Sequence, residues 1–249
     1  MTAATRDRLL DVAMRLFWLK GYGATSIADI LHEAGANAGS LYHFFPTKQD
    51  LLLAVLERYR QGIGPMLLEP AWEGVDDPIE RVFALLGRYR RSLEETECSY
   101  GCPIGSLALE LHEPDPAVRE LLSVNFEGWV AAVQRCLEDA GDRIPADVDR
   151  RELAVFVLTT MEGGVMQART HRALETFDAS VNRLRDYFNR LQMSAISDQR
   201  SAIRDQGVEG PLGMLRALGP TRAAVTRNTQ HATLGSTTQH HPPSPRRAP

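Results

Sequence analysis

Residues 25–52 read TSIADILHEAGANAGSLYHFFPTKQDLL, and this stretch decides the fold. Its apolar residues recur at helical spacing on either side of one glycine, Gly35: Ile27, Ile30, Leu31, Leu41 and Phe44. Glycine commonly ends a helix, and Asn37 just after it is a good N-terminal cap for the next one. Two short helices joined by a turn of three or four residues that contains glycine form a helix-turn-helix. The sequence therefore predicts a helix-turn-helix within its first sixty residues.

Further helices are predicted on both sides of this stretch. Residues 6–20 form an amphipathic segment before it, and Thr47 with Asp50 gives a capping-box pattern at the start of the next helix. After that helix, the glycines and proline of residues 62–65 predict a break. Three later helix starts are marked by a residue that can cap the helix, followed by proline: Asp77-Pro78, Cys102-Pro103 and Asp115-Pro116.

The last two predicted helices cover roughly residues 149–172 and 177–193. No segment alternates apolar and polar residues between turn signals, as a half-buried strand would. The predicted fold class is therefore all-α, with an N-terminal helix-turn-helix domain followed by a larger helical domain.

Composition narrows the class of protein further. The chain has 249 residues, 43% of them hydrophobic and 24% charged, which is typical of a globular protein with a sizeable core. It has neither an apolar run long enough to span a membrane nor the pattern of a secretory signal, so no membrane partner is expected. Three cysteines are too few and odd in number for a disulfide framework. We therefore expect a cytoplasmic protein.

The charge distribution suggests three segments. Residues 1–60 carry seven Lys and Arg against six Asp and Glu, and residues 61–194 are acidic. Residues 195–249 carry seven basic side chains against three acidic ones and contain few apolar residues after residue 219. The expected organisation is a helix-turn-helix domain at 1–60, a larger helical domain at 61–194, and a basic, disordered tail at 195–249.

The second helix of the helix-turn-helix has the properties of a recognition helix. Small side chains at its start allow a helix to enter the major groove, and its N-terminal amides attract phosphate. A hydroxyl and an imidazole one turn later can bind phosphates, and the starts of the neighbouring helices can do the same. The predicted DNA-binding residues are therefore Thr25, Ser26, Asn37, Ala38, Gly39, Ser40, Tyr42, His43 and Lys48.

This stretch, with LFWLKGYGATS (residues 16–26) leading into it, resembles the DNA-binding domain of the TetR family of bacterial transcriptional regulators. The residues that stand at the family's spacing are Gly21-Tyr22, Thr25-Ser26, Gly35, Gly39, Leu41-Tyr42, Phe45, Lys48 and Leu51. The later stretch GCPIGSLALELHEPDPAVRELL (residues 101–122) resembles one branch of the family. Ala38 departs from the family pattern, which often has lysine there, so weaker attraction to phosphate is expected.

The resemblance implies a homodimer formed by the last two long helices of each subunit. Residues at helical spacing that fit such a seam are Val165, Ala168, Phe177, Val181, Leu184, Phe188 and Leu191. From periodicity alone, the same residues could equally be the core of one subunit. A two-fold dimer would bind a palindromic operator on double-stranded DNA.

The resemblance also implies a cavity for a small, largely apolar effector. The side chains expected near it are Phe83, Cys102, Leu107, Phe126, Trp129 and Met161, although aromatic and methionine residues at such spacing are more often plain core. Cys102 precedes Pro103 at a helix start, where the helix dipole would lower the pKa of its thiol. Sensing of oxidants or electrophiles by Cys102 is therefore an alternative to ligand binding.

Catalytic patterns are weak. The chain has no G-x-S-x-G, H-E-x-x-H or Walker sequence, and the spacing of Cys98, Cys102 and His112 does not match a structural zinc site. We therefore expect no enzyme activity, metal or cofactor. The function indicated is a dimeric repressor that a small effector releases from its operator. An interaction protein that has lost DNA binding is the alternative from another class.

Overall fold

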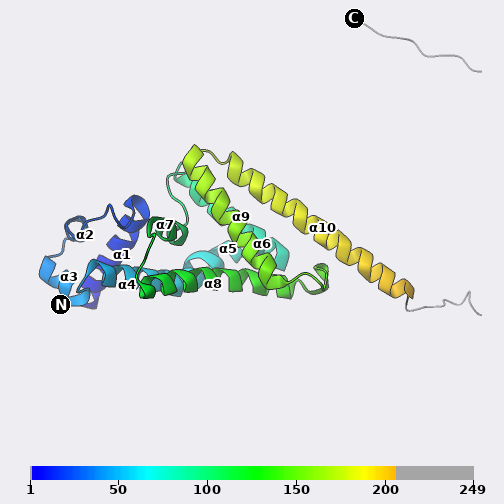
Figure 1. The fold of residues 1–249 in the computed structure, drawn as a ribbon, viewed down its shortest axis with the longest axis horizontal. Helices are drawn as coiled ribbons and strands as arrows, with labels where there is room; N and C mark the ends of the chain where they lie inside the picture. The colour runs from blue at the N-terminus through cyan, green and yellow to red at the C-terminus, as the bar shows by residue number, and fades with distance from the viewer. Residues whose placement is uncertain (1, 206–249) are drawn as a thin grey trace, which may run out of the picture. The chain divides into compact units, whose positions relative to one another are not determined.

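A computed structural model describes residues 2–205 of the chain (Figure 1). This part is built from helices and contains no β-strand. The elements run as α1 (Ala3–Lys20), α2 (Ile27–Ala34), α3 (Ala38–Phe44), α4 (Lys48–Gly62), a π-helical turn η1 (Ile63–Leu68), α5 (Glu69–Trp72), α6 (Pro78–Glu95), α7 (Pro103–Glu110), α8 (Pro116–Asp139), a 3-10 turn η2 (Gly141–Arg143), α9 (Arg150–His171) and α10 (Glu175–Asp205). The predicted all-α class is confirmed.

The ends of the first four helices follow the sequence signals, except that α1 begins at Ala3 and not at the predicted residue 6. Ser26 and Asp29 form a reciprocal capping box at α2, and Thr47 and Asp50 form another at α4. Gly35 ends α2 with a φ of +56°, a left-handed conformation that glycine adopts without steric cost. The turn between α2 and α3 therefore comes directly from the order of these residues.

The helices of the N-terminal domain pack around one apolar core. The side chains of α1, α2, α3 and α4 that form its centre are completely or almost completely buried: Leu9, Phe17, Ile30, Leu41, Leu51 and Val55. Burying a side chain of this size contributes about 1.5–3 kcal/mol. This core fixes the orientation of α3, whose opposite face is left exposed.

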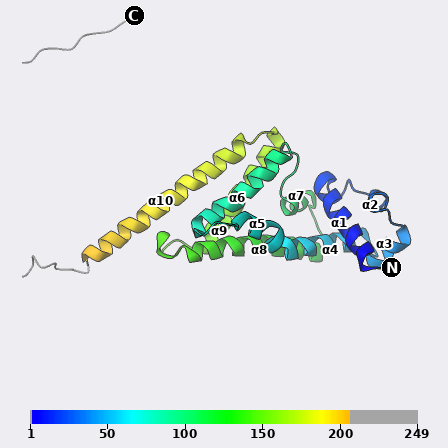
Figure 2. The same ribbon diagram turned by 180° about the vertical axis from the view of Figure 1, so that it is seen from behind.

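The larger domain has its own core, formed by α6, α8, α9 and α10. Figures 1 and 2 show α9 rising at an angle from α8, after which the chain turns back into α10. Phe177 and Phe188 of α10 are fully buried against this core. Two charged pairs hold α10 to α6 from outside, Arg90 with Asp178 at 2.8 Å and Arg185 with Glu80.

The two domains share packing through α7. Side chains from α7 and the start of α8 belong to the core of the N-terminal domain rather than to that of the larger domain: Cys102, Ile104, Leu107, Val118 and Leu122. An element that follows residue 60 in the sequence is thus an integral part of the helix-turn-helix domain's interior. A shift of α7 would disturb that core.

The predicted break after α4 is wrong. Residues 63–68 continue the helical path as a π-helical turn, and α5 follows without a gap. Met66 in this turn lies close to Gly62, where a Cβ atom would come within 2.5 Å of the Met66 sulfur. Glycine at position 62 allows this wider turn, and such turns are frequent at functional sites.

The last helix also runs further than expected. α10 continues to Asp205, past the expected boundary at residue 194, and Ala195 is buried. The segment 195–205 is therefore helical and not part of a disordered tail. The rest of the predicted tail, 206–249, lies outside the described residues. In the described part of the chain, no helix is both long and apolar enough to cross a membrane.

Candidate DNA interface and effector cavity

The start of α3 presents small side chains to solvent. Asn37 caps the helix, with its Oδ1 accepting a hydrogen bond from the Ser40 amide at 2.8 Å. Ala38 and Gly39 are exposed, and so are Tyr42, at 50%, and His43 one turn later. Leu41 points the other way and is fully buried. The helix therefore offers a narrow end flanked by a hydroxyl and an imidazole, as base and phosphate contact requires.

Two residues predicted to contact DNA face inward. The Thr25 side chain is fully buried, and its hydroxyl donates to the carbonyl oxygens of Gly21 at 2.7 Å and Leu16 at 3.2 Å. Ser40 is also buried, at 9% exposure. The Thr25 hydroxyl is therefore used inside the protein and does not reach DNA in this structure. Contact of the Ser40 side chain with DNA stays a prediction, and only a small part of that residue is exposed.

Ser26 and Lys48 are also engaged within the domain. The Ser26 hydroxyl donates to Asp29 at 2.6 Å, within the capping box. The Lys48 ammonium donates to the Tyr22 carbonyl at 2.5 Å and lies 4.2 Å from the centre of the Tyr22 ring. Desolvation lowers the pKa of Lys48. A direct contact of either residue with DNA stays a prediction.

The turn between α1 and α2 is held from the larger domain. The Glu110 carboxylate at the end of α7 accepts hydrogen bonds from the amides of Tyr22 at 2.9 Å and Gly23 at 2.5 Å. A Cβ atom on Gly21 would come within 2.9 Å of this carboxylate, and Gly21 has a φ of +88°. The sequence analysis missed Glu110, because nothing in its local pattern shows that it reaches a turn about ninety residues earlier.

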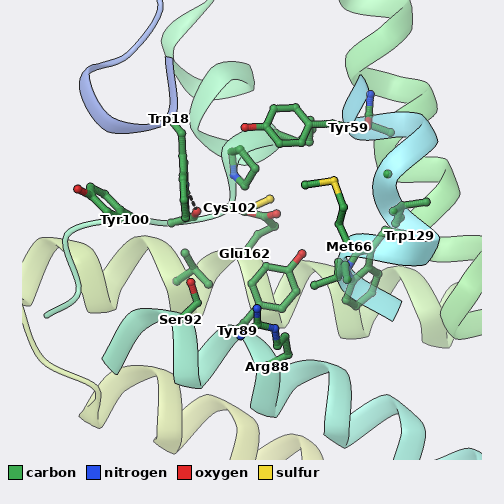
Figure 3. Close-up of a pocket in the computed structure, with 18 of the residues that line it drawn as sticks. Trp18, Tyr59, Met66, Arg88, Tyr89, Ser92, Tyr100, Cys102, Trp129 and Glu162 are labelled. Carbon is green, nitrogen blue, oxygen red and sulfur yellow. Dashed lines mark hydrogen bonds between the residues drawn. The ribbon is translucent and has the colours of Figure 1, made fainter. Parts of the chain in front are cut away.

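The start of α7 contacts the N-terminal domain as well. The Trp18 indole, near the end of α1, donates to the Gly101 carbonyl at 2.7 Å, and its ring lies 5.0 Å from that of Tyr100 (Figure 3). Both ends of α7 are thus tied to the segment that leads into the helix-turn-helix.

A cavity of about 420 Å³ lies where α1, α4, α6, α7, α8 and α9 meet. Figure 3 shows Trp18 and Tyr100 toward one end of it and Met66 and Trp129 toward the other, with Cys102, Glu162 and Tyr89 between them. Most of the wall is apolar or aromatic, as is usual for small-molecule sites. The cavity therefore has walls from both domains.

Three of the six predicted effector-site residues line this cavity: Cys102, Phe126 and Trp129. The other three do not line it. Phe83 packs edge-on against Phe188 at 5.3 Å, Leu107 lies in the N-terminal core, and Met161 is fully buried in the core of the larger domain. These three side chains form core instead, as apolar residues at helical spacing usually do. Ligand binding by the first three stays a prediction.

The environment of Cys102 opposes the predicted activation of its thiol. The amide of Gly105 donates to the Cys102 sulfur at 3.5 Å, as expected at a helix start. Burial and the nearby Glu162 carboxyl nevertheless raise the pKa of the thiol well above its ordinary value. The prediction of a lowered pKa is wrong, because loss of solvation outweighs the helix dipole here.

The predicted dimer residues lie mostly inside the subunit. Val165, Ala168, Phe177, Leu184 and Phe188 are buried in the core of the larger domain, and Val181 and Leu191 pack against it. The alternative reading of that periodicity, an intramolecular core, is therefore the one that the structure supports.

A different apolar surface is exposed on α9 and α10. Phe156, Met166 and Tyr187 are 48%, 50% and 42% exposed, and the rings of Phe156 and Tyr187 lie 5.9 Å apart. We call this surface, with the small residues Thr160 and Gly163 beside it, the α9–α10 face.

No group of His, Cys, Asp and Glu side chains within residues 2–205 is placed to hold a metal ion. Cys98, Cys102 and Cys136 are all buried free thiols.

Comparison with known proteins agrees with this arrangement. Residues 9–55 match the model for bacterial regulatory proteins of the tetR family, and residues 78–183 match the C-terminal domain of LmrA/YxaF-like transcriptional regulators. The regulator YxaF of Bacillus subtilis (strain 168) is 31% identical over 68% of this chain and 86% of its own length. DhaR of Mycobacterium sp. (strain GP1), named as a transcriptional repressor, is 26% identical over 70% of this chain and 86% of its own.

A solved structure also shares the fold and was determined with DNA. A cysteine mutant of the TetR-family regulator CifR, in complex with double-stranded operator DNA, is 27% identical and covers 72% of this chain and 95% of that one, with a TM-score of 0.61. The matched proteins are transcriptional regulators and not enzymes. This chain therefore belongs to the TetR family of bacterial regulatory proteins and is a DNA-binding transcriptional regulator with an N-terminal helix-turn-helix.

Proposed function

We propose that the protein is a homodimeric repressor that binds a palindromic operator and leaves it when a small, largely apolar ligand fills the cavity. The observation that carries this proposal is that the cavity wall includes α1 and α7, both of which pack against the helix-turn-helix. A ligand there touches the segments that set the position of α3. The relative DhaR, named as a repressor, supports the direction of control.

The proposed dimer uses the α9–α10 face. Phe156, Met166 and Tyr187 are large apolar side chains that a lone subunit leaves in water. Small residues beside them, such as Gly163, let a partner helix approach closely. A two-fold arrangement through this face presents two α3 helices at a fixed separation, which a palindromic operator would match.

The proposed coupling runs through α7. Its start, at Cys102 and Ile104, lines the cavity, and its end holds the turn before α2 through the Glu110 carboxylate. A ligand shifts an equilibrium only if it binds one of two states better. The state favoured by the ligand would have α7 displaced and the α3 separation wrong for the operator.

The test is DNA binding to the region upstream of the protein's own gene, followed by fluorescence anisotropy with and without ligands. A panel of apolar small molecules is first screened for an increase in Tm, since a ligand that binds only the folded state stabilises it. The proposal predicts a salt-sensitive, sequence-specific complex that stabilising ligands dissociate. Specific binding that none of the stabilising ligands weakens would overturn ligand control, and absence of specific binding would overturn repression.

A further inference from the structure

The Glu162 carboxyl group is an unusual feature of the cavity. It comes from the middle of α9 and lies next to Cys102 at the centre of the site (Figure 3). Its Oε1 atom is buried and has no hydrogen-bond partner. Among the described residues, no Arg, Lys or His forms an ion pair with it, and desolvation raises its pKa. A buried carboxyl without a cation is costly unless something else compensates for it.

Aromatic rings surround this carboxyl group. The cavity is lined by Trp18, Tyr59, Tyr89, Tyr100, Phe126 and Trp129. The faces of such rings attract cations, most strongly where water is excluded. Burial also raises the pKa values of Tyr89 and Cys102, so both stay protonated and neutral near pH 7. Glu162 is thus the acidic group at the centre of an aromatic site.

The other charged side chains of the wall are less available to a ligand. Asp11 accepts a hydrogen bond from Arg58 at 3.2 Å, and Arg15 pairs with Glu33. Arg88 lies beyond Tyr89, at the edge of the site in Figure 3. Glu162 is therefore the charged side chain of the wall that lies nearest the centre of the site in Figure 3.

We propose that the effector is an apolar organic cation, with one positively charged centre among aromatic or aliphatic groups, and that the Glu162 carboxylate is its counter-ion. The inference rests on the proposed function and adds the charge of the ligand to it. Pairing with the cation would give a partner to the buried Oε1 atom, which has no hydrogen bond within the protein.

The position of Glu162 also links such a ligand to α7. The carboxyl group lies against Gly105 in the first turn of α7, where a Cβ atom would come within 2.2 Å of its Oε2. A cation that draws the carboxylate toward the centre of the cavity removes this support from α7. The same helix holds the turn before α2 through Glu110.

Two ions of nearly the same shape and opposite charge test the proposal on the unmodified protein. Tetraphenylphosphonium and tetraphenylborate are titrated by isothermal calorimetry, with triphenylphosphine oxide as an uncharged reference. The cation should bind at least about tenfold more tightly than the anion. The reason is that a favourable interaction with a charged group changes a binding constant by more than about tenfold. Equal or tighter binding of the anion would overturn the proposal.

The Glu162→Gln variant assigns the preference to this carboxyl group. Its affinity for the cation should fall by about tenfold or more while that for triphenylphosphine oxide stays the same. Glu152→Gln, an exposed position on the same helix, is the matched control and should bind like the unmodified protein. An unchanged affinity for the cation in Glu162→Gln would overturn the assignment.

Operator binding separates the two proposals. If the cation dissociates the operator complex of the unmodified protein but not that of Glu162→Gln, both are supported. If only uncharged molecules bind the cavity and dissociate the complex, ligand control stands and the cation inference fails. If the cation binds with Glu162-dependent affinity and leaves the operator complex intact, the site is correctly assigned and the proposed ligand control fails.

Discussion

The Thr25 hydroxyl donates to two main-chain carbonyl oxygens at the end of α1, and the Tyr42 hydroxyl lies on an exposed side chain. Both are polar residues of the same small domain, but of the two only Tyr42 is exposed to solvent. Thr25 instead stabilises the entry into α2, where the chain must turn sharply after Gly21. For a single residue, its burial and its hydrogen-bond partners show whether a polar side chain stabilises the fold or is available to bind DNA.

Replacement of Thr25 by valine should therefore reduce stability and not DNA contact. The variant keeps the shape of the side chain and loses both hydrogen bonds, so the free energy of unfolding should fall by about 1–3 kcal/mol. Thr25→Ser keeps the hydroxyl and is the matched control. Urea denaturation measures the change. Stability equal to that of the unmodified protein would show that the buried hydroxyl contributes nothing.

Alkylation of Cys102 should be slow at neutral pH. Because burial and Glu162 raise the pKa of its thiol, the thiolate fraction near pH 7 is smaller than in a free cysteine, and it grows as pH rises. Peptide mapping after iodoacetamide treatment of the folded protein measures the rate, and the urea-unfolded protein is the reference. Faster labelling in the folded state would restore the thiol-sensing alternative.

The eight-residue helix α7 is one of the elements that join the two halves of the molecule. Its apolar side chains belong to the N-terminal core, its start lines the cavity, and its last residue bonds to the turn before α2. Contacts of this kind transmit a ligand's effect only if the helix has two discrete positions. A substitution in α7 that contacts neither the ligand nor the DNA can therefore weaken the coupling between ligand binding and operator release.

The Glu110→Gln variant should uncouple ligand binding from operator release. The amide replaces one acceptor oxygen by a donor group, so one of the Tyr22 and Gly23 amides loses its partner. The ratio of operator Kd values with and without ligand should fall, while the ligand's own affinity changes little. Glu113→Gln, at an exposed position with no described contact, is the control. An unchanged ratio would exclude Glu110 from the coupling.

Local sequence signals predict the elements well but not their contacts. Capping boxes at Ser26 and Thr47 and the glycine at position 35 mark helix ends through bonds between near neighbours. The π-helical turn at 63–68 escaped prediction because glycine and proline also mark true breaks. Contacts of Glu110 with Tyr22, or of Glu162 with Gly105, depend on tertiary packing between distant segments, which periodicity does not contain.

At the scale of the whole molecule, the apolar side chains of α9 and α10 divide between two roles. The predicted seam faces inward and forms the core, and the α9–α10 face of Phe156, Met166 and Tyr187 remains exposed. Helical spacing identifies amphipathic helices but does not state which apolar side meets a partner subunit. The proposed dimer therefore depends on the residues outside the predicted seam.

Phe156→Arg should convert the proposed dimer into a monomer. A charged side chain in the centre of an apolar interface is desolvated without a partner, so dimerisation weakens while the exposed position leaves the subunit fold intact. Sedimentation velocity measures the state of assembly. Val124→Arg, at an exposed apolar position on α8, is the matched control and should remain dimeric. A dimeric Phe156→Arg protein would contradict the proposed interface.

The most direct test of the central claim, that α3 binds DNA through its N-terminal end, is operator binding by Gly39→Asp. Gly39 is exposed at the second position of α3, and a Cβ atom there makes only an ordinary 3.4 Å contact with Asn37, so folding should be retained. A carboxylate at this point should repel the DNA and lower operator affinity in fluorescence anisotropy by at least about tenfold. Ala117→Asp, at the second position of α8, should bind normally. Unchanged operator affinity in a folded Gly39→Asp protein would contradict the account.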